Sequence, residues 1–224
     1  MSDEKMIVAI DGPAGVGKST LAKALAEKMR VPFLDTGAMF RILAYTLGEE
    51  AARLSEEELR RKKPEFSLEG YGDATRLLFN GKVIGAEIRS EEIGALASKI
   101  AARPEIRAIL LEAQRKLGEQ TSLVAEGRDT GTVVFPNATR KFFLEARPEV
   151  RAGRRLNDPR EKRSEATLEE IATMIARRDE QDRTRATAPL RPAEDAIIID
   201  TSDLDIPEVL TLLEDYVRAY NQKG

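Results

Sequence analysis

Two glycines, a lysine and a serine near the N-terminus have the spacing of a phosphate-binding loop. Four residues separate Gly12 from Gly17, and Lys18 and Ser19 follow, which fits the pattern G-x-x-x-x-G-K-[ST]. Glycines let successive backbone N–H groups turn toward a phosphate chain, and a helix that begins there points the positive end of its dipole at the same anion. In such loops the lysine reaches the β- and γ-phosphates and the serine hydroxyl binds Mg²⁺. The segment therefore predicts a site for a nucleoside triphosphate, taken as ATP, with Mg²⁺.

The loop connects an apolar run to a helical stretch, which is the context that the motif requires. A glycine-rich surface turn with a solvated lysine is the alternative, but chance rarely supplies a strand, this motif and a helix in order. Triphosphate binding leaves the reaction open, because motors, switches and small-molecule kinases share such loops. We expect the triphosphate to contact Gly12, Pro13, Ala14, Gly15, Val16, Gly17, Lys18, Ser19 and Thr20, with Lys18 also catalytic and Ser19 the metal ligand.

Arginine is concentrated in one segment of a chain that is acidic overall. Residues 147–191 hold eleven arginines and one lysine against nine acidic residues, whereas the whole chain has a formal net charge of −3. A guanidinium group binds phosphate oxygens in pairs and stays ionised when desolvated, so the segment is typical of phosphate recognition. A helical surface with ion pairs explains residues such as Arg160 and Arg163 equally well. Nucleic-acid binding is less favoured, because acids are interspersed and residues 146–191 contain no Phe, Tyr or Trp.

The composition excludes several other kinds of chemistry. The 224-residue chain has no cysteine and no histidine, so thiol nucleophiles, serine–histidine triads and nearly all zinc enzymes are excluded. Its 42% hydrophobic and 33% charged residues are typical of a globular protein with a charged surface. The apolar run near the N-terminus is too short for a signal sequence or a membrane span. We expect a cytoplasmic protein that contacts no membrane and has no nucleic acid as its main partner.

Short apolar runs that alternate with helical stretches must position these side chains. This pattern predicts an α/β fold in which helices cover both faces of a parallel sheet. After the glycine loop, Leu21, Leu25 and Met29 recur every four residues, which indicates one apolar face of a helix. The expected strands are Met6 to Ile10, Pro32 to Asp35, Ser122 to Glu126, Lys141 to Ala146 and Ala196 to Asp200.

Two other segments carry their own structural signals. Short β-like pieces surround Asn80 and Gly81, a dipeptide typical of hairpin turns, so we expect a small antiparallel insertion from about Phe66 to Ser90. Near the other end, Asp205 and Glu208 have the spacing of a helix N-terminus, and apolar residues follow at helical spacing. We interpret that C-terminal helix as structural.

Five segments of the chain resemble, in order and spacing, the bacterial cytidylate kinases: DGPAGVGKST, LDTGAMFR, ASKIAARPEIR, EGRDTGTVVFPNA and RRDEQDRTRATAPL. The resemblance covers about residues 6–218. It implies one domain over 1–224, with a P-loop three-layer core around a five-stranded parallel sheet (about 1–60, 100–150 and 190–224). It also implies a monophosphate-binding region with an antiparallel insertion (about 61–99) and an arginine-bearing helical lid (about 151–188). The implied reaction is phosphoryl transfer from ATP to CMP, with dCMP as a second substrate, by a monomer.

The resemblance also implies roles for individual residues. Cytosine is faced by Ser98, Arg107 and Asp129, and Arg178 and Asp182 lie near the ribose and the acceptor phosphate. Arg41, Arg128 and Arg185 bind the acceptor phosphate, and Arg155 belongs to the lid. The implied catalytic residues are Lys18, Arg128, Arg155, Arg178 and Arg185, and the implied substrate-binding residues are Thr36, Arg41, Ser98, Arg107, Arg128, Asp129, Arg178, Asp182 and Arg185.

The assignment of cytosine has a chemical reason at Asp129. Cytosine carries an amino donor at position 4 where uracil carries a carbonyl acceptor, so a carboxylate accepts from one base and repels the other. From the residues alone, a cap just past a strand end is an equal reading of Asp129. The resemblance has two departures: Thr36 stands where serine is frequent, and keeps the hydroxyl, while Phe40 stands where tyrosine is frequent and is interpreted as packing.

Several questions stay open at this level. Asp35 and Glu126 either assist Mg²⁺ through water or cap strand ends. Transfer to a phosphate needs no general base, which is consistent with the absence of histidine. The first rival function is a P-loop kinase for UMP, AMP or another small metabolite. The second is a P-loop regulatory module that binds nucleotide and a protein or RNA partner, and that hydrolyses ATP slowly whether or not CMP is present.

Overall fold

The computed structural model describes residues 5–158 and 167–221. Arg160, Arg163 and the rest of 159–166, which belong to the predicted lid, lie outside the described residues. The centre of the fold is a five-stranded parallel sheet in the order β2-β6-β1-β7-β8. Its strands are β1 (Ile7–Asp11), β2 (Phe33–Asp35), β6 (Leu123–Gly127), β7 (Arg140–Glu145) and β8 (Ile197–Asp200). All five predicted runs are therefore confirmed as strands, and each strand end lies within one residue of its predicted position.

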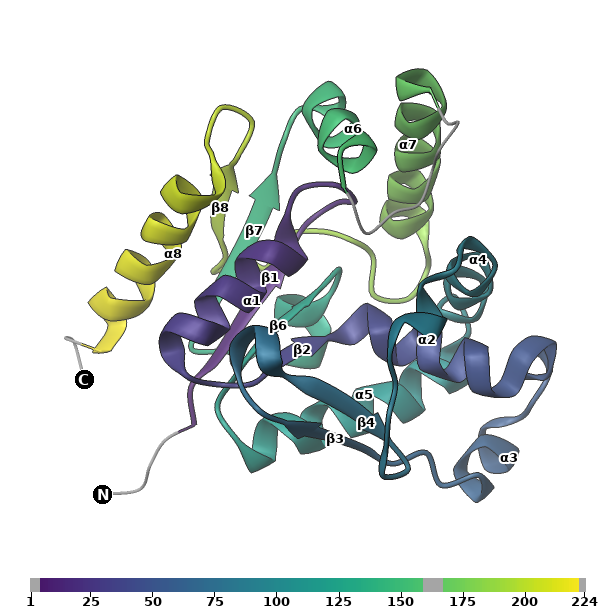
Figure 1. The fold of residues 1–224 in the computed structure, drawn as a ribbon. Coiled ribbons are helices and arrows are strands. Elements are labelled where there is room, and N and C mark those ends of the chain that lie inside the picture. The colour runs from purple at the N-terminus through teal and green to yellow at the C-terminus, as the bar shows by residue number, and fades with distance from the viewer. Residues whose placement is uncertain (1–4, 159–166, 222–224) are drawn as a thin grey trace.

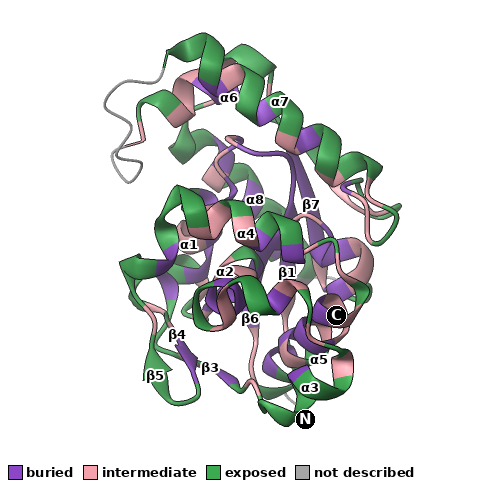
Figure 2. Cartoon of the chain, turned by 90° about the vertical axis from the view of Figure 1, so that its right-hand side faces the viewer, coloured by how far each residue is buried: buried purple, intermediate pink, exposed green. Residues whose placement is uncertain are grey.

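Helices cover both faces of this sheet because successive side chains of each strand point to opposite sides. Val8 and Ile10 of β1 belong to one hydrophobic cluster, with α1 (Lys18–Met29) and α8 (Ile206–Asn221). Ala9 belongs to the other cluster, with α2 (Thr36–Leu47) and α5 (Pro104–Gln120). Figure 1 shows α1 and α8 on one side and α2 and α5 on the other, and Figure 2 shows the strands buried between them. The predicted three-layer α/β architecture is confirmed.

A second, antiparallel sheet confirms the predicted insertion. It consists of β3 (Phe66–Glu69), β4 (Arg76–Phe79) and β5 (Lys82–Val83), in that order. Asn80 and Gly81 form the β4–β5 turn with φ of 49° and 75°, the left-handed conformation that makes this dipeptide favourable there. The rings of Phe66 and Phe79 lie 5.1 Å apart, and both side chains join the cluster of α2 and α5. The insertion is thus anchored to the main core.

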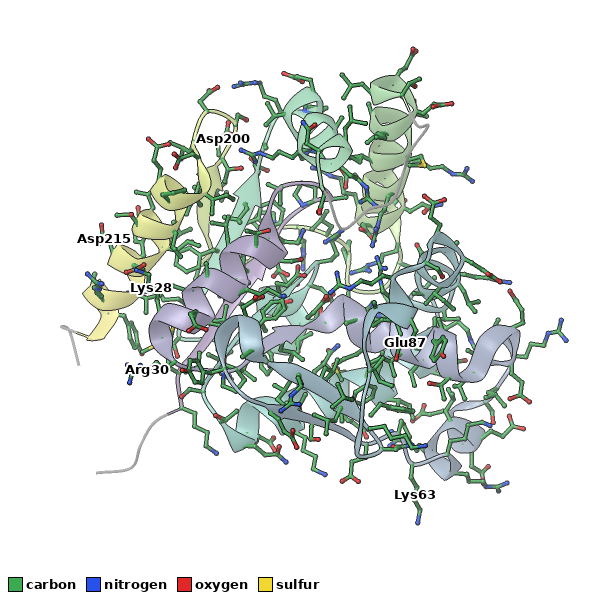
Figure 3. All side chains as sticks on the ribbon, viewed as in Figure 1. Lys28, Arg30, Lys63, Glu87, Asp200 and Asp215 are labelled. Atoms are coloured by element: carbon green, nitrogen blue, oxygen red, sulfur yellow. The ribbon has the colours of Figure 1, made fainter. Side chains whose placement is uncertain are left out.

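The remaining helices surround the carboxyl edge of the parallel sheet. α6 (Pro148–Leu156) and α7 (Leu168–Thr184) stand above that edge, and α4 (Glu91–Ile100) approaches α2 in Figure 1, while α3 (Glu56–Arg61) lies near α5. The C-terminal helix begins as predicted: the N–H of Glu208 donates to Asp205 and the N–H of Asp205 donates to Glu208, each at 2.8 Å. Charged side chains such as Lys63 and Asp215 point outward (Figure 3). In the described ranges, no helix has the length and apolar character needed to cross a membrane.

Candidate active site

The glycine loop occupies the carboxyl end of β1, where ligands of parallel α/β sheets bind. Gly12 has a φ of 150°, and a Cβ there would lie 2.3 Å from the carbonyl oxygen of Leu144 in β7. Gly15 has a φ of 76°, and a Cβ there would lie 2.8 Å from the carbonyl oxygen of Arg151 in α6. Only glycine allows these two approaches, so the loop is held between the sheet and α6. The predicted helix follows it as α1, with Gly17 before its first residue.

Lys18 points back into the loop and is nearly buried, with 6% of its surface exposed. Its ammonium group donates to the carbonyl oxygen of Pro13 at 2.7 Å. Burial, together with the positive charges of Arg128 and Arg178, lowers the pKa of Lys18 to about 7. A phosphate chain in the loop would supply the negative charge that favours the ammonium form.

The oxygens beside the loop fit a magnesium site that is completed by phosphate. The Ser19 hydroxyl donates to Glu126 at 2.6 Å, and burial and the charge of Asp35 raise the pKa of Glu126. Asp35 itself accepts from the N–H of Ala38 at 2.9 Å, so it caps α2. The described residues contain no group of three acidic, cysteine or histidine side chains that could hold a metal ion. Because Mg²⁺ commonly takes phosphate oxygens, waters and few protein ligands, this set suits it when the nucleotide is bound.

Four arginines from different elements lie close enough to affect one another. The charge of Arg128, together with burial, lowers the pKa of Arg178 to about 10, and the charges of Arg155 and Arg41 act in the same direction. Arg128 lies in the loop after β6 and Arg178 in α7. Arg155 lies in α6 and Arg41 in α2. One carboxylate offsets part of the charge of Arg128, whose Nε lies 2.8 Å from Asp182 Oδ2. Such a concentration of guanidinium groups is suited to an anion with several charges.

A cavity of about 210 Å³ lies beside these arginines. Asp129, 8% exposed, forms an ion pair with Arg107 in its wall and a second one with Arg185 at 3.2 Å. The guanidinium of Arg107 lies 5.7 Å from the centre of the Phe40 ring, so Phe40 stacks on a cation as well as packing. The lining residues include Thr36, Phe40, Arg107, Leu111, Gln114, Asp129 and Val134. The size of this cavity, and its lining of apolar, aromatic and polar groups, suit a nucleobase.

Of the predicted substrate-binding residues, Thr36, Arg107 and Asp129 line this cavity. Ser98 lies on an exposed part of α4 and does not line the cavity. Arg41 donates weakly to the carbonyl oxygen of Ile88, at 3.5 Å, and its guanidinium lies close to Gly94 of α4. The structure therefore gathers Thr36, Arg107, Arg128, Asp129, Asp182 and Arg185, and it leaves Ser98 outside. The role of Ser98 stays a prediction.

Comparison with known proteins places this arrangement in a family. The cytidylate kinase family model matches residues 8–219. The chain belongs to the cytidylate kinase family. It is 51% identical to the cytidylate kinase of Nitratidesulfovibrio vulgaris over 95% of this chain and 93% of that protein. It is 49% identical to the cytidylate kinase of Oleidesulfovibrio alaskensis over 94% of this chain and 97% of that protein.

Solved structures that resemble this cytidylate kinase family member support the fold. An uncharacterized protein from Eubacterium ventriosum has a TM-score of 0.53 at 16% identity, over 96% of this chain and 99% of that chain. Shikimate kinase from Bacteroides thetaiotaomicron has a TM-score of 0.50 at 18% identity, over 95% and 98%. At these identities the likeness concerns the fold alone.

Sequence reasoning missed several residues that shape the site. Asp11 at the end of β1, 4% exposed, accepts from the N–H groups of Thr130 and Gly131 at 2.9 and 2.7 Å. It thereby fixes the loop that carries Arg128 and Asp129. The sequence signal for Asp11 was an acidic residue at the end of an apolar strand. Gln114, Arg151 and Asp179 were missed as well, although Gln114 and Asp179 are polar residues on otherwise apolar helix faces.

Gly127 provides a test of the packing beneath the cavity of this cytidylate kinase family member. A Cβ there would lie 2.4 Å from Thr36 Oγ1 and 2.5 Å from Thr130 Oγ1. We expect Gly127→Ala to lower the free energy of unfolding by about 1–3 kcal/mol, as overpacking does. In α6, a Cβ added at Gly153 would meet no atom of the described residues within 4 Å, so Gly153→Ala should stabilise by roughly 0.5–1 kcal/mol. Urea titrations would compare both variants, and equal stabilities would contradict the expectation.

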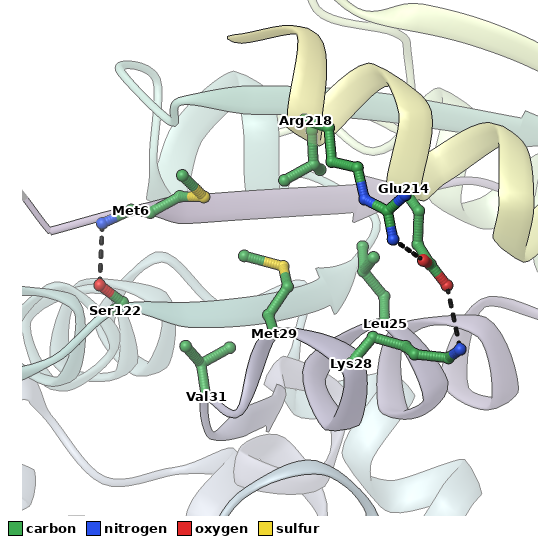
Figure 4. Close-up of a pocket in the computed structure, with 9 residues that line it drawn as sticks. Met6, Leu25, Lys28, Met29, Val31, Ser122, Glu214 and Arg218 are labelled. Carbon is green, nitrogen blue, oxygen red and sulfur yellow. Dashed lines mark hydrogen bonds and ion pairs between the residues drawn. The ribbon is translucent and has the colours of Figure 1, made fainter. Parts of the chain in front are cut away.

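A second cavity, of about 370 Å³, lies between α1 and α8 and is shown in Figure 4. Its wall is largely apolar, with Leu25 and Met29 facing inward, and Glu214 at its rim pairs with Lys28 and Arg218. None of the predicted site residues lines it. This cavity is larger than the one beside Asp129, but Lys18 and the arginines of the candidate site do not line it.

Proposed function

We propose that this protein transfers the γ-phosphoryl group of ATP to CMP and to dCMP, with Mg²⁺, and forms ADP with CDP or dCDP. One observation carries the proposal. The charges of Arg128 and Arg178 act on Lys18 of the glycine loop strongly enough to help lower its pKa. Donor-phosphate and acceptor-phosphate groups therefore share one small region. An anionic acceptor beside ATP requires such additional cations to offset its charge.

The chain's residues supply positioning and charge for this reaction. Transfer passes through a loose transition state, which demands in-line alignment and neutralisation of oxygens more than proton transfer. Lys18 follows the transferred group, and Arg128, Arg155, Arg178 and Arg185 hold the acceptor phosphate and the developing charge. Ser19 would hold Mg²⁺, which would neutralise negative charge on the phosphate oxygens. The acceptor phosphate is already ionised at neutral pH, so the reaction proceeds without a general base.

Asp129 accounts for the choice of base. Its carboxylate accepts a hydrogen bond from the amino group of cytosine, whereas the carbonyl oxygen of uracil would face it with repulsion. Arg107, held by the ion pair, supplies a donor to the neighbouring ring nitrogen. If the wrong base binds, a buried polar group of the pocket is left without a hydrogen-bond partner, so the pocket rejects that base strongly.

ADP release tests the proposal directly. ATP and Mg²⁺ are supplied without acceptor and then with CMP, dCMP, UMP, AMP or GMP. We expect rapid release with CMP and dCMP. Release with UMP or AMP instead would retain a kinase but refute the cytosine pocket, and slow release that ignores every acceptor would indicate a regulatory ATPase. Light scattering during size-exclusion chromatography tests the further proposal that the protein acts as a monomer.

The pKa of Lys18 leads to a prediction about protons. At pH 8.5 the free lysine is largely neutral, because its pKa is about 7. Nucleotide phosphates favour the ammonium form, so binding must take up a proton, and affinity should fall as pH rises above 7 by up to about tenfold per unit. Calorimetric titration of MgADP in buffers of different ionisation enthalpy measures this uptake. A Lys18→Met variant should show none, and equal uptake in both proteins would contradict the assignment.

A further inference from the structure

A buried ion pair joins the glycine loop to the two helices above it. Asp179 of α7 and Arg151 of α6 are 6% and 7% exposed, and they form an ion pair. Asp179 also accepts from the backbone N–H of Ala14 at 3.0 Å, and Arg151 donates to the backbone carbonyl of Ala14 at 3.0 Å. Both backbone groups of one loop residue are therefore bound by this pair.

Arg151 extends the connection to the sheet. Its Nε donates to the carbonyl oxygen of Ala146, just after β7, at 3.1 Å. Its own carbonyl lies so close to Gly15 that a Cβ at that position would approach it to 2.8 Å. The start of α6 is thus fitted against the loop through side chain and backbone together.

Apolar contacts surround the ion pair. Ala14 of the loop, Ala152 of α6, and Ile171 and Ile175 of α7 form one buried cluster. Ile171, Ile175 and Asp179 are spaced by four residues, so they occupy the same face of α7. Asp179 therefore ends an apolar stripe with a carboxylate that is desolvated and fully committed to the loop and Arg151.

The same helix carries acceptor-site groups beside this stripe. Arg178 precedes Asp179, and Asp182, one turn later, pairs with Arg128 at 2.8 Å. A displacement of Asp179 relative to Ala14 would move these side chains relative to the donor loop. Efficient transfer requires that the reacting atoms be positioned with an error well under about 1 Å.

We propose that Asp179 is a positioning residue that, with Arg151, holds the glycine loop and α7 as one unit, so that the donor nucleotide and the acceptor strengthen each other's binding. This inference rests on the proposed function for the identity of the two ligands. Its loop component concerns MgADP alone and does not depend on the acceptor.

Three variants separate the effect of the Asp179 charge from that of its hydrogen bond with Ala14 and from a general effect of substitution in α7. Asp179→Ala removes the pair and the bond to Ala14, whereas Asp179→Asn keeps an oxygen for the N–H of Ala14 and loses the charge. Glu180→Gln is the matched control, because Glu180 is the exposed neighbour on the same helix. Calorimetry measures the affinity for MgADP, and the affinity for CMP with and without a non-hydrolysable ATP analogue.

We expect Asp179→Ala to weaken MgADP binding by about tenfold and to bring the mutual enhancement of the two ligands, about five-fold or more in the parent, close to one. Asp179→Asn should recover part of the MgADP affinity, which a purely structural defect would not show. Glu180→Gln should match the parent. Thermal unfolding verifies that measurements are made well below each midpoint, and Arg151→Lys replaces Asp179→Ala if the latter does not fold.

The outcomes distinguish this inference from the proposed function. A folded Asp179→Ala protein with parental MgADP affinity and parental enhancement overturns the inference while CMP phosphorylation stands. If the unsubstituted protein shows no mutual enhancement of nucleotide and CMP binding, the proposed coupling is wrong as well. A parent that binds MgADP but does not use CMP refutes the proposed function, and the loss of MgADP affinity in Asp179→Ala is still decided by its own measurement.

Discussion

Replacing Lys18 with methionine is expected to reduce kcat for CMP phosphorylation by about 10²–10³, the loss typical of removing one preorganised group that stabilises transition-state charge. The ammonium group is buried against the carbonyl oxygen of Pro13, at 2.7 Å, in the glycine loop that we propose binds the phosphates of ATP. Methionine has similar length and fits an apolar environment, so the fold should persist. Steady-state rates at saturating ATP and CMP measure the effect.

Lys23 offers the matched control on the same helix. Its ammonium pairs with Asp73 at 2.8 Å, away from the loop. We expect Lys23→Met to keep kcat within about twofold of the parent, because partly exposed ion pairs contribute little. If Lys18→Met retained parental kcat in a folded protein, the loop would have a role other than transfer.

The main elements were predictable because their signals are local. β1, β6 and β7 each contain a run of at least three apolar residues because both faces of the sheet are covered, and Val8 and Ala9 enter opposite clusters. The hairpin was predictable from Asn80 and Gly81 because a left-handed turn strongly restricts residue type. The glycine loop was predictable because motif, strand and helix all agree.

The charge network was not predictable from residue types alone. Asp129 bonds Arg107 and Arg185, and Asp182 bonds Arg128, across elements that are far apart in the chain. Spacing along the sequence cannot assign such partners, since Arg107 and Arg128 pair with acids 22 and 54 residues away. The pairing is a product of tertiary structure, namely how α7 lies over the carboxyl edge of the sheet.

Asp179 illustrates the same limit in a different way. The family resemblance implies roles for its neighbours Arg178 and Asp182 but none for Asp179, which faces the glycine loop. The sequence held a signal, a carboxylate continuing the stripe of Ile171 and Ile175. Reading it required knowing that a loop 165 residues away packs there.

Changing Asp129 to asparagine is expected to lower kcat/KM for CMP by about 10²–10³ and to reduce the preference for CMP over UMP at least about tenfold. An amide can accept from the amino group of cytosine or, after rotation, donate to the carbonyl of uracil, so the repulsion that rejects uracil disappears. Arg107 and Arg185 would also lose the charge that now pairs with both. Because we propose that those arginines bind the base and the acceptor phosphate, the loss should appear in KM and kcat together.

Asp215→Asn is the control, because Asp215 is an exposed carboxylate on the outer side of α8 (Figure 3). It should leave both substrates' kinetics unchanged. Competition assays with CMP and UMP in one mixture measure the ratio of kcat/KM without error from enzyme concentration. If Asp129→Asn lost activity but kept the parental ratio, Asp129 would act only by holding Arg107 and Arg185, and cytosine would have to be read by another group of the cavity. Gln114 would then be the next to test, because its buried amide lines the same cavity and can accept or donate.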